Sequence, residues 1–265
     1  MTQVLEPLLL REHRAQVIER MRRLVCPPAT LAGTIIAYQL GLADRDGAPR
    51  EAPARNLVRP SLCLWAAGAC GGAVSAALPL AVSIELFHNF TLIHHDIEDD
   101  RREAHERATA WTIWGLGQGV NAGDALHSLA LSVLSQSMAD DATVLRIFTR
   151  VVTAVNESID GKTRASGATG AALTPFSELK IALRRAGALF GASLEAGAIV
   201  AGAGNSTVVA LRRAGRLLGA AQELPSAQGL ACVARARTLV AGCGISGEWL
   251  ARFNEMTEYL GHDLA

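Results

Sequence analysis

The sequence is short of lysine, of aromatic side chains and of net charge. Lysine stands only at positions 162 and 180, so arginine carries nearly all of the positive charge. Aromatic residues make up 5% of the 265 residues, and 25 basic side chains balance 25 acidic ones. A neutral chain lacks the basic balance with which proteins bind nucleic acid or an anionic membrane surface, so we expect neither partner.

The sequence also lacks the marks of an oxidised, exported or membrane-spanning protein. Its five cysteines are odd in number and form no C-x-x-C pair, which indicates reduced thiols and a cytoplasmic location. The first residues have neither the basic start nor the small-residue cleavage site of a signal peptide. No run of about 18 apolar residues is free of charge, so we expect no membrane span.

The hydrophobic pattern is helical almost throughout, and few segments alternate with a period of two. We expect helices over residues 3–23, 28–42, 60–71, 74–100, 108–118, 120–138, 140–164, 175–203, 206–223, 227–242 and 245–263. The clearest breaks fall at residues 27–28, 44–53 and 167–174, which contain proline or glycine. These features predict an all-α fold, with residues 1–265 forming a single domain.

An apolar segment ends in a cluster of acids and histidines, E-L-F-H-N-F-T-L-I-H-H-D-I-E-D-D, from residue 85 to residue 100. At about 100° per residue, five of its side chains fall near one helix face. These are Glu85, His88, His95, Asp96 and Asp99. Carboxylates on an oily helix are costly to bury unless a cation lies between them. A hard cation such as Mg²⁺, which can also hold a phosphate, suits such ligands.

Two other interpretations of this segment remain open. It could be a solvated acidic helix end, although acids at a helix C-terminus oppose the helix dipole. The histidines at positions 88, 94 and 95 could instead bind zinc, but that site needs a fourth ligand. We favour the metal–phosphate interpretation over the first alternative, and both over zinc. Taken alone, Asp124 is the kind of residue that is found at the start of a helix. Arg184 and Arg185, taken alone, are typical of a pair of surface residues.

Several motifs together resemble one family, the trans-isoprenyl diphosphate synthases or polyprenyl synthetases. They are V-R-P-S-L near residue 60, L-I-H-H-D-I-E-D near 95, R-A-T-A-W near 110, V-N-A-G-D-A-L near 123 and L-R-R-A-G near 185. The resemblance covers residues 50–222. It implies a helical bundle around a central apolar cavity, in which two aspartate-rich motifs hold Mg²⁺ ions that bind and ionise an allylic diphosphate.

The resemblance also implies roles for individual residues. Asp96 and Asp99, with His95, would be catalytic. Asp96, Asp99 and Asp100 would hold the metal. The substrate-binding residues would be Arg59, His88, Arg185, Gln222, Phe87, Phe90 and Asp124, with the two phenylalanines limiting substrate length. The ligand would be geranyl, farnesyl or geranylgeranyl diphosphate, and the chain would form a homodimer or pair with a homologue.

The chain departs from the family pattern where phosphate or metal should bind. His95 replaces the first aspartate of the first motif, and imidazole is a poor Mg²⁺ ligand. It is either a damaged ligand or, at a near-neutral pKa, a base. Asn56 and Leu57 replace the basic residues before Arg59, and Ala104 and His105 replace an arginine pair. These cations bind isopentenyl diphosphate in family members that elongate chains.

The largest departure follows Gln222, where the family carries its second aspartate-rich motif. Here the sequence reads Q-E-L-P-S-A-Q-G-L and has no aspartate until Asp263, and we expect the domain to be shortened after about residue 222. Three functions remain. The favoured one is a terpene-synthase-like enzyme that ionises one allylic diphosphate. The alternatives are a non-catalytic subunit of a prenyl diphosphate synthase, and an ordinary chain-elongating prenyltransferase.

Overall fold

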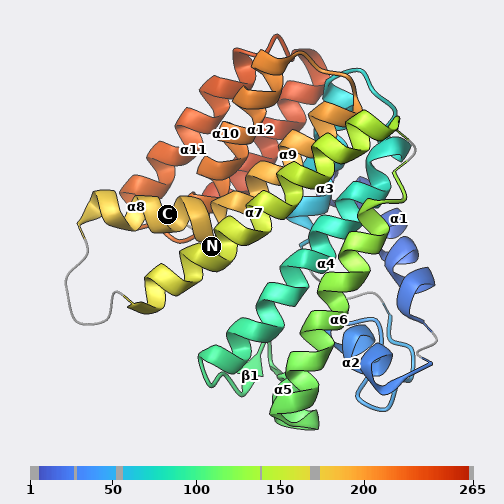
Figure 1. Cartoon of the computed structure of the whole chain (residues 1–265). Helices are drawn as coiled ribbons and strands as arrows, with labels where there is room; N and C mark the ends of the chain where they lie inside the picture. The colour runs from blue at the N-terminus through green and yellow to red at the C-terminus, as the bar shows by residue number, and fades with distance from the viewer. Residues whose placement is uncertain (1–5, 27–28, 52–55, 138, 168–173, 263–265) are drawn as a thin grey trace.

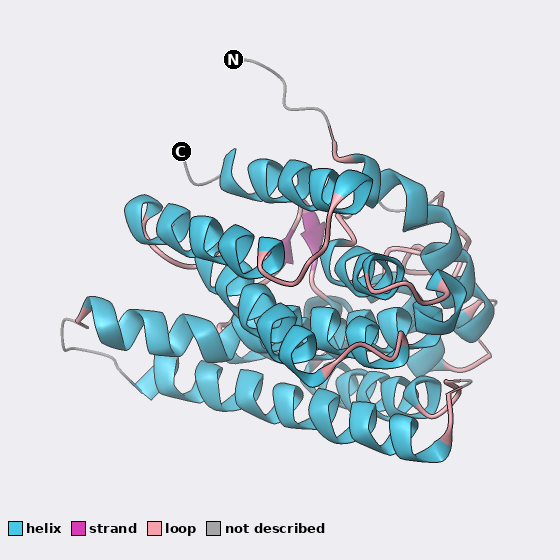
Figure 2. Cartoon of the chain, turned by 90° about the horizontal axis from the view of Figure 1, so that it is seen from above, coloured by secondary structure: helices cyan, strands magenta, loops and turns pink. Residues whose placement is uncertain are grey.

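The computed structural model describes residues 6–26, 29–51, 56–137, 139–167 and 174–262, which form twelve helices and one short hairpin. Figures 1 and 2 show that helices make up nearly all of this part of the chain. The elements are α1 (Leu8–Val25), α2 (Leu31–Gln39), α3 (Val58–Ala69), α4 (Val74–Glu98), β1 (Glu103–Ala104), β2 (Arg107–Ala108), α5 (Ala110–Trp114), α6 (Leu116–Leu134), α7 (Asp141–Gly167), α8 (Pro175–Arg185), α9 (Gly187–Val200), α10 (Asn205–Ala221), α11 (Ser226–Ala241) and α12 (Gly247–His262). The all-α prediction is confirmed.

Helix α9 is the centre of the bundle and packs against α3, α4, α7 and α10. Small residues allow this, because a Cβ atom on Gly197 would lie 2.1 Å from the carbonyl oxygen of Cys63 in α3. A Cβ atom on Gly215 of α10 would likewise lie 2.4 Å from the carbonyl oxygen of Phe190. The glycines therefore set the short distances between α9 and its neighbours.

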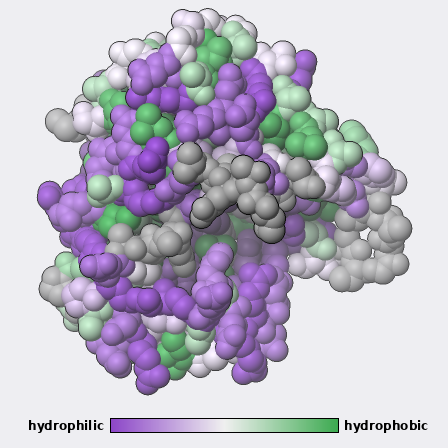
Figure 3. All heavy atoms as spheres, turned by 180° about the vertical axis from the view of Figure 1, so that it is seen from behind, coloured by the Kyte–Doolittle hydropathy of each residue, from purple (hydrophilic) through white to green (hydrophobic). Residues whose placement is uncertain are grey.

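Helix α4, which carries the acidic segment, runs beside α6 (Figure 1). The buried Ser83 hydroxyl donates to the carbonyl of Ala130 in α6, at 2.8 Å. By length and composition α4 passes the test for a membrane-crossing helix, but 72% of its apolar window is buried inside the protein. Core helices of soluble proteins pass the same test. Seen from behind, the surface is mostly hydrophilic, with scattered hydrophobic patches (Figure 3).

The structure corrects three element boundaries. The segment 175–203 forms two helices, because the chain bends at Ala186, where the Ser158 hydroxyl donates to the carbonyl of Arg185. The break expected between residues 118 and 120 lies at Gly115, whose φ is 88°. Residues 103–108 form a hairpin that the hydrophobic pattern does not predict. The breaks at 27–28 and 168–173 lie outside the described residues, whereas residues 44–51 are non-helical as expected.

Candidate functional site

A pocket of about 600 Å³ opens between α2, α3, α4 and the β1–β2 hairpin. Most of the residues that line it are polar or charged, although the resemblance implied an apolar cavity. The basic side chains in the lining are Arg50, Arg59, Arg101, Arg107, His88 and His105, and the acidic ones are Glu51, Glu85 and Asp96. Four guanidinium groups in one recess favour an anionic ligand, because arginine presents a forked set of donors to phosphate oxygens.

Two of these arginines carry buried donors that have no partner among the described residues. They are Nε of Arg59 and one terminal nitrogen of Arg107. The Arg59 guanidinium lies 4.5 Å from the ring centre of Phe190, and that of Arg107 lies 4.0 Å from the ring centre of Tyr38. Burial lowers the pKa of Arg59 to about 10, against the opposing effects of Glu85 and Glu223, so it remains charged at neutral pH. An unsatisfied buried donor is uncommon in a folded protein and calls for an explanation, and a role in binding a ligand is one.

The acidic segment of α4 does not present a single functional face. Glu85, His88 and Asp96 line the pocket, as expected. Asp99 instead faces α7, where the Lys162 ammonium donates to its Oδ1 at 2.6 Å. His95 faces the same side, close enough to Lys162, Arg185 and Arg101 for their charges to act on it. Three of the five predicted side chains therefore line the pocket and two do not, although Asp96 and Asp99 both lie near Arg101.

The imidazole of His95 is held in its neutral form. Burial is the main cause, and with Lys162, Arg185 and Arg101 it lowers the pKa to about 4, while Asp99 acts in the opposite direction. Of the two alternatives for this residue, the base with a near-neutral pKa disagrees with this lowered pKa, and the damaged ligand does not. A catalytic role for His95 stays a prediction, and so do the roles assigned to Asp96 and Asp99.

The predicted metal ligands do not assemble into a Mg²⁺ site. Asp96 lies at the pocket, Asp99 binds Lys162, and the exposed Asp100 pairs with Arg102 at 3.6 Å. Throughout the described part of the chain, no three His, Cys, Asp or Glu side chains are grouped as metal ligands would be. The residues present thus do not fit the metal that the resemblance implied.

A second ion pair lies where the chain departs from the family pattern. Nε of Arg185 donates to both carboxylate oxygens of Glu223, at 2.9 Å each, just after α10. Burial raises the pKa of Glu223, and the charge of Arg185 and its hydrogen bond only partly offset this. Gln222 is exposed, and its amide lies 3.5 Å from the carbonyl of Leu260. Arg185 therefore has an acidic partner within the chain.

The remaining predicted residues lie away from the pocket. Phe87 and Phe90 are buried and pack edge-on against His127 of α6, with ring centres 5.4 and 5.1 Å apart. Asp124 of α6 is 68% exposed and lies 3.8 Å from Nε2 of His94. Their assignment to substrate binding stays a prediction.

Sequence reasoning missed the importance of Lys162 and of Gly161 beside it. A Cβ atom on Gly161 would lie 2.5 Å from the backbone nitrogen of Arg185, so this glycine lets α7 approach the junction of α8 and α9. That approach places Lys162 against the end of α4. The scarcity of lysine in an arginine-rich chain was the one available signal, because it makes each lysine conspicuous.

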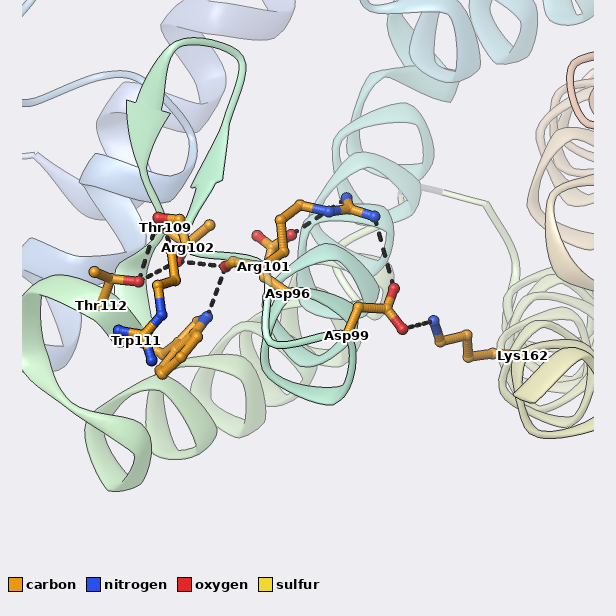
Figure 4. Close-up of polar contacts among 8 residues, drawn as sticks. All are labelled: Asp96, Asp99, Arg101, Arg102, Thr109, Trp111, Thr112 and Lys162. Carbon is orange, nitrogen blue, oxygen red and sulfur yellow. Dashed lines mark hydrogen bonds and ion pairs between the residues drawn. The ribbon is translucent and has the colours of Figure 1, made fainter. Parts of the chain in front are cut away.

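Arg101 was also missed, and Figure 4 shows its guanidinium between Asp96 and Asp99. Its terminal nitrogens lie 3.5 Å from Asp96 Oδ1 and 3.6 Å from Asp99 Oδ2. The Arg101 carbonyl accepts hydrogen bonds from the Trp111 indole and the Thr109 hydroxyl, both at 2.9 Å. These bonds tie the base of the hairpin to the start of α5 and hold Arg101 in place.

Known proteins resemble this chain in both sequence and fold. A geranylgeranyl diphosphate synthase from Mycobacterium tuberculosis is 35% identical over 197 residues, which are 74% of this chain and 53% of that protein. A (2E,6E)-farnesyl diphosphate synthase from Mycobacterium bovis is 37% identical over 175 residues, 65% of this chain and 48% of that protein. The chain thus spans about half the length of these curated relatives.

The fold matches solved structures along nearly the whole chain. The geranylgeranyl pyrophosphate synthetase from Geoglobus acetivorans superposes with a TM-score of 0.86 at 18% identity, covering 95% of this chain and 99% of that one. A polyprenyl synthetase from Streptomyces coelicolor A3(2) gives a TM-score of 0.73 at 23% identity, covering 97% and 92%. The family model for polyprenyl synthetase matches residues 54–223, about two thirds of the sequence. The chain belongs to the polyprenyl synthetase family.

Proposed function

We propose that this chain is a subunit of a prenyl diphosphate synthase, which binds a diphosphate but relies on a catalytic homologue to elongate the prenyl chain. The observation that carries this proposal is the ion pair of Lys162 with Asp99. In this pair, Asp99 of the first aspartate-rich segment binds Lys162, a cation that the protein itself supplies. Members of the family depend on Mg²⁺, whereas the role proposed for this chain requires no metal of its own.

The polar pocket supports the binding part of the proposal. Arg59 and Arg107 line this recess together with Arg50 and Arg101, and each of the first two also has a buried donor without a partner among the described residues. Charge-assisted bonds from guanidinium to phosphate are about twice as strong as neutral hydrogen bonds. The pocket therefore suits the diphosphate group of a prenyl ligand, with geranyl, farnesyl and geranylgeranyl diphosphate as the candidates.

The second candidate is a prenyltransferase that elongates chains without a partner. The relatives favour it, because the Mycobacterium proteins with 35% and 37% identity are named as geranylgeranyl and farnesyl diphosphate synthases. These names favour prenyl transfer over the terpene-synthase-like function that the missing cations suggested. Independent elongation ranks second because Asp99 is paired with Lys162 and Glu223 with Arg185.

A reconstitution assay separates the two candidates. The purified chain is incubated with Mg²⁺, isopentenyl diphosphate and each allylic diphosphate, alone and mixed with a catalytic prenyl diphosphate synthase from the same genome. We expect no longer diphosphate from the chain alone, and a changed rate or product length in the mixture. Longer products from the chain alone would establish the second candidate, and an unchanged mixture would refute the first.

The pocket is tested by calorimetry with inorganic pyrophosphate, without metal. Arg59→Ala should weaken binding by about tenfold or more, because it removes a charged donor from a partly buried site. Arg59→Lys keeps the charge but loses the forked donors of the guanidinium, so its affinity should lie between those of the wild type and Arg59→Ala. The matched control is Arg45→Ala, since Arg45 is exposed and does not line the pocket. Equal affinities in all four proteins would exclude this pocket as the diphosphate site.

A further inference from the structure

Lys162 occupies a position that brings its charge to the end of α4. It lies on α7, its side chain is only 12% exposed, and its ammonium lies 2.6 Å from Oδ1 of Asp99. The neighbouring Gly161 permits this reach, since any Cβ atom there would collide with the backbone at Arg185. The contact is thus built into the crossing of α7 with the α8–α9 junction and does not depend on a freely moving surface chain.

Arg101 approaches the same carboxylates from the other side. Its two terminal nitrogens lie near Oδ1 of Asp96 and Oδ2 of Asp99, so each oxygen of Asp99 faces a cation (Figure 4). The hydrogen bonds to the Arg101 carbonyl fix the backbone from which this side chain extends. Two carboxylates and two cations therefore meet at the end of α4, with no net charge.

A divalent cation gains little by entering such a group. It would have to displace the Lys162 ammonium from Asp99 or lie within a few ångströms of it, and like charges at that distance repel. The imidazole of His95, on the same side of α4, supplies no negative charge to offset this repulsion. Mg²⁺ would also have to give up water, which it does reluctantly and then chiefly for carboxylate oxygens.

We propose that Lys162 is a resident counter-ion, which takes the place of a metal at the acidic end of α4 and keeps Mg²⁺ from binding there. The segment then serves as an ion-pair network that joins α4 to α7. This inference deepens the proposed function, because it names the residue that makes this half of the site independent of metal. It also implies that His95→Asp alone does not restore a metal site, because Lys162 still pairs with Asp99.

The test is a titration with MgCl₂ alone, by calorimetry, and with Mn²⁺ by electron paramagnetic resonance. The proteins are the wild type, His95→Asp, Lys162→Gln and the double variant His95→Asp/Lys162→Gln. The control is Lys180→Gln, which removes the other lysine of the chain, on α8, where it lies 4.3 Å from the ring centre of Phe176. We expect the wild type, His95→Asp and the control to bind equally weakly, and the double variant to bind about tenfold more tightly or better.

Two results would overturn the inference. One is a wild type that binds Mg²⁺ as tightly as the double variant. The other is a His95→Asp variant that gains the full affinity while Lys162 is intact. The second result can be read even if Lys162→Gln does not fold, because a gain of about tenfold by His95→Asp over the wild type needs no Lys162 variant. Thermal unfolding of each variant confirms that the proteins compared are folded.

The titration stands apart from the reconstitution assay because it contains neither prenyl substrate nor partner enzyme. If the wild type excludes Mg²⁺ but no synthase responds to it, the counter-ion inference stands and the subunit proposal fails. If the wild type binds Mg²⁺ and still changes the products of a synthase, the reverse holds.

Discussion

Two ion pairs contribute charges that act on His95, and the pKa values of their acids shift in opposite directions. In the first, Asp99 is 37% exposed and Lys162 is 12% exposed. In the second, Glu223 is 20% exposed and Arg185 is 35% exposed. The hydrogen bond from Lys162 lowers the pKa of Asp99, whereas burial raises the pKa of Glu223 in spite of Arg185.

This difference shows that an ion-pair partner alone does not decide how much a carboxylate contributes to the stability of the fold. At Asp99 the carboxylate keeps contact with water, so the hydrogen bond and charge of the partner outweigh desolvation. At Glu223 the acid is the more buried member, and the loss of water is the larger effect. The first pair should therefore stabilise the fold at neutral pH, while the second is closer to balance.

The largest effect is expected from Asp99→Asn. It leaves the nearly buried Lys162 ammonium without its carboxylate, so the free energy of unfolding should fall by about 1–3 kcal/mol. Urea denaturation at pH 7 measures this. Asp100→Asn is the control, because Asp100 is exposed and its pair with Arg102 should be worth less than about 0.5 kcal/mol. Equal losses in the two variants would refute the special role of Asp99.

A double-mutant cycle isolates the interaction of Asp99 with Lys162 from the cost of either change. We expect a coupling energy of about 1–2 kcal/mol between Asp99→Asn and Lys162→Met, since contacting residues couple while distant ones add. The same cycle on Glu223→Gln and Arg185→Met should give a smaller value. A larger coupling in the second pair would reverse the comparison.

Glu223→Gln should lower the free energy of unfolding by less than Asp99→Asn does, by about 1 kcal/mol or below. The glutamine removes a charge whose burial is unfavourable, and its carbonyl can still accept from Nε of Arg185. Urea denaturation at pH 7 is again the measurement. A loss greater than that of Asp99→Asn would mean that the charge on Glu223 is needed where burial opposes it.

The smallest expected effects are on how the free energy of unfolding changes with pH. The contributions of Asp99 and Glu223 to this change should have opposite signs. Asp99 has a lowered folded pKa, so its contribution is present above the usual value of 3.8 and is lost as the pH falls through the folded value. Glu223 has a raised folded pKa, so its contribution is present below 4.5 and is lost as the pH rises through the folded value.

Urea denaturation between about pH 2.5 and pH 7 tests this with the same two variants. On acidification, the difference between wild type and Asp99→Asn should shrink. The difference between wild type and Glu223→Gln should instead move in favour of the wild type. If both differences changed in the same direction on acidification, the opposite pKa shifts of Asp99 and Glu223 would be contradicted.

The sequence predicted the helical architecture because apolar residues recur with the helical period along most of the chain. It missed the β1–β2 hairpin for an identifiable reason. The turn residues His105 and Glu106 have positive φ angles of 51° and 60°, and no glycine or asparagine marks the turn. The bend at Ala186 was missed because its backbone stays in the right-handed helical region, and the hydroxyl bound there comes from another helix.

The candidate site was predictable only where it depends on one helix. The spacing of Glu85, His88 and Asp96 correctly indicated a shared face, and all three line the pocket. Asp99 was expected on that face, but its partner Lys162 lies 63 residues further along the chain. Likewise, Arg185 and Glu223 are 38 residues apart and meet only when α8 and α10 have packed. Periodicity along one helix carries no information about such partners.

The absent side chain of Gly161 has a consequence for how this protein tolerates change. A methyl group there would press on the backbone of Arg185 and move α7 outward. The chain would keep its lysine, its aspartate and its composition, yet the two charges would no longer meet. A purely steric position thus decides whether Lys162 and Asp99 meet, and their pairing can be lost through a change at a residue that carries no charge.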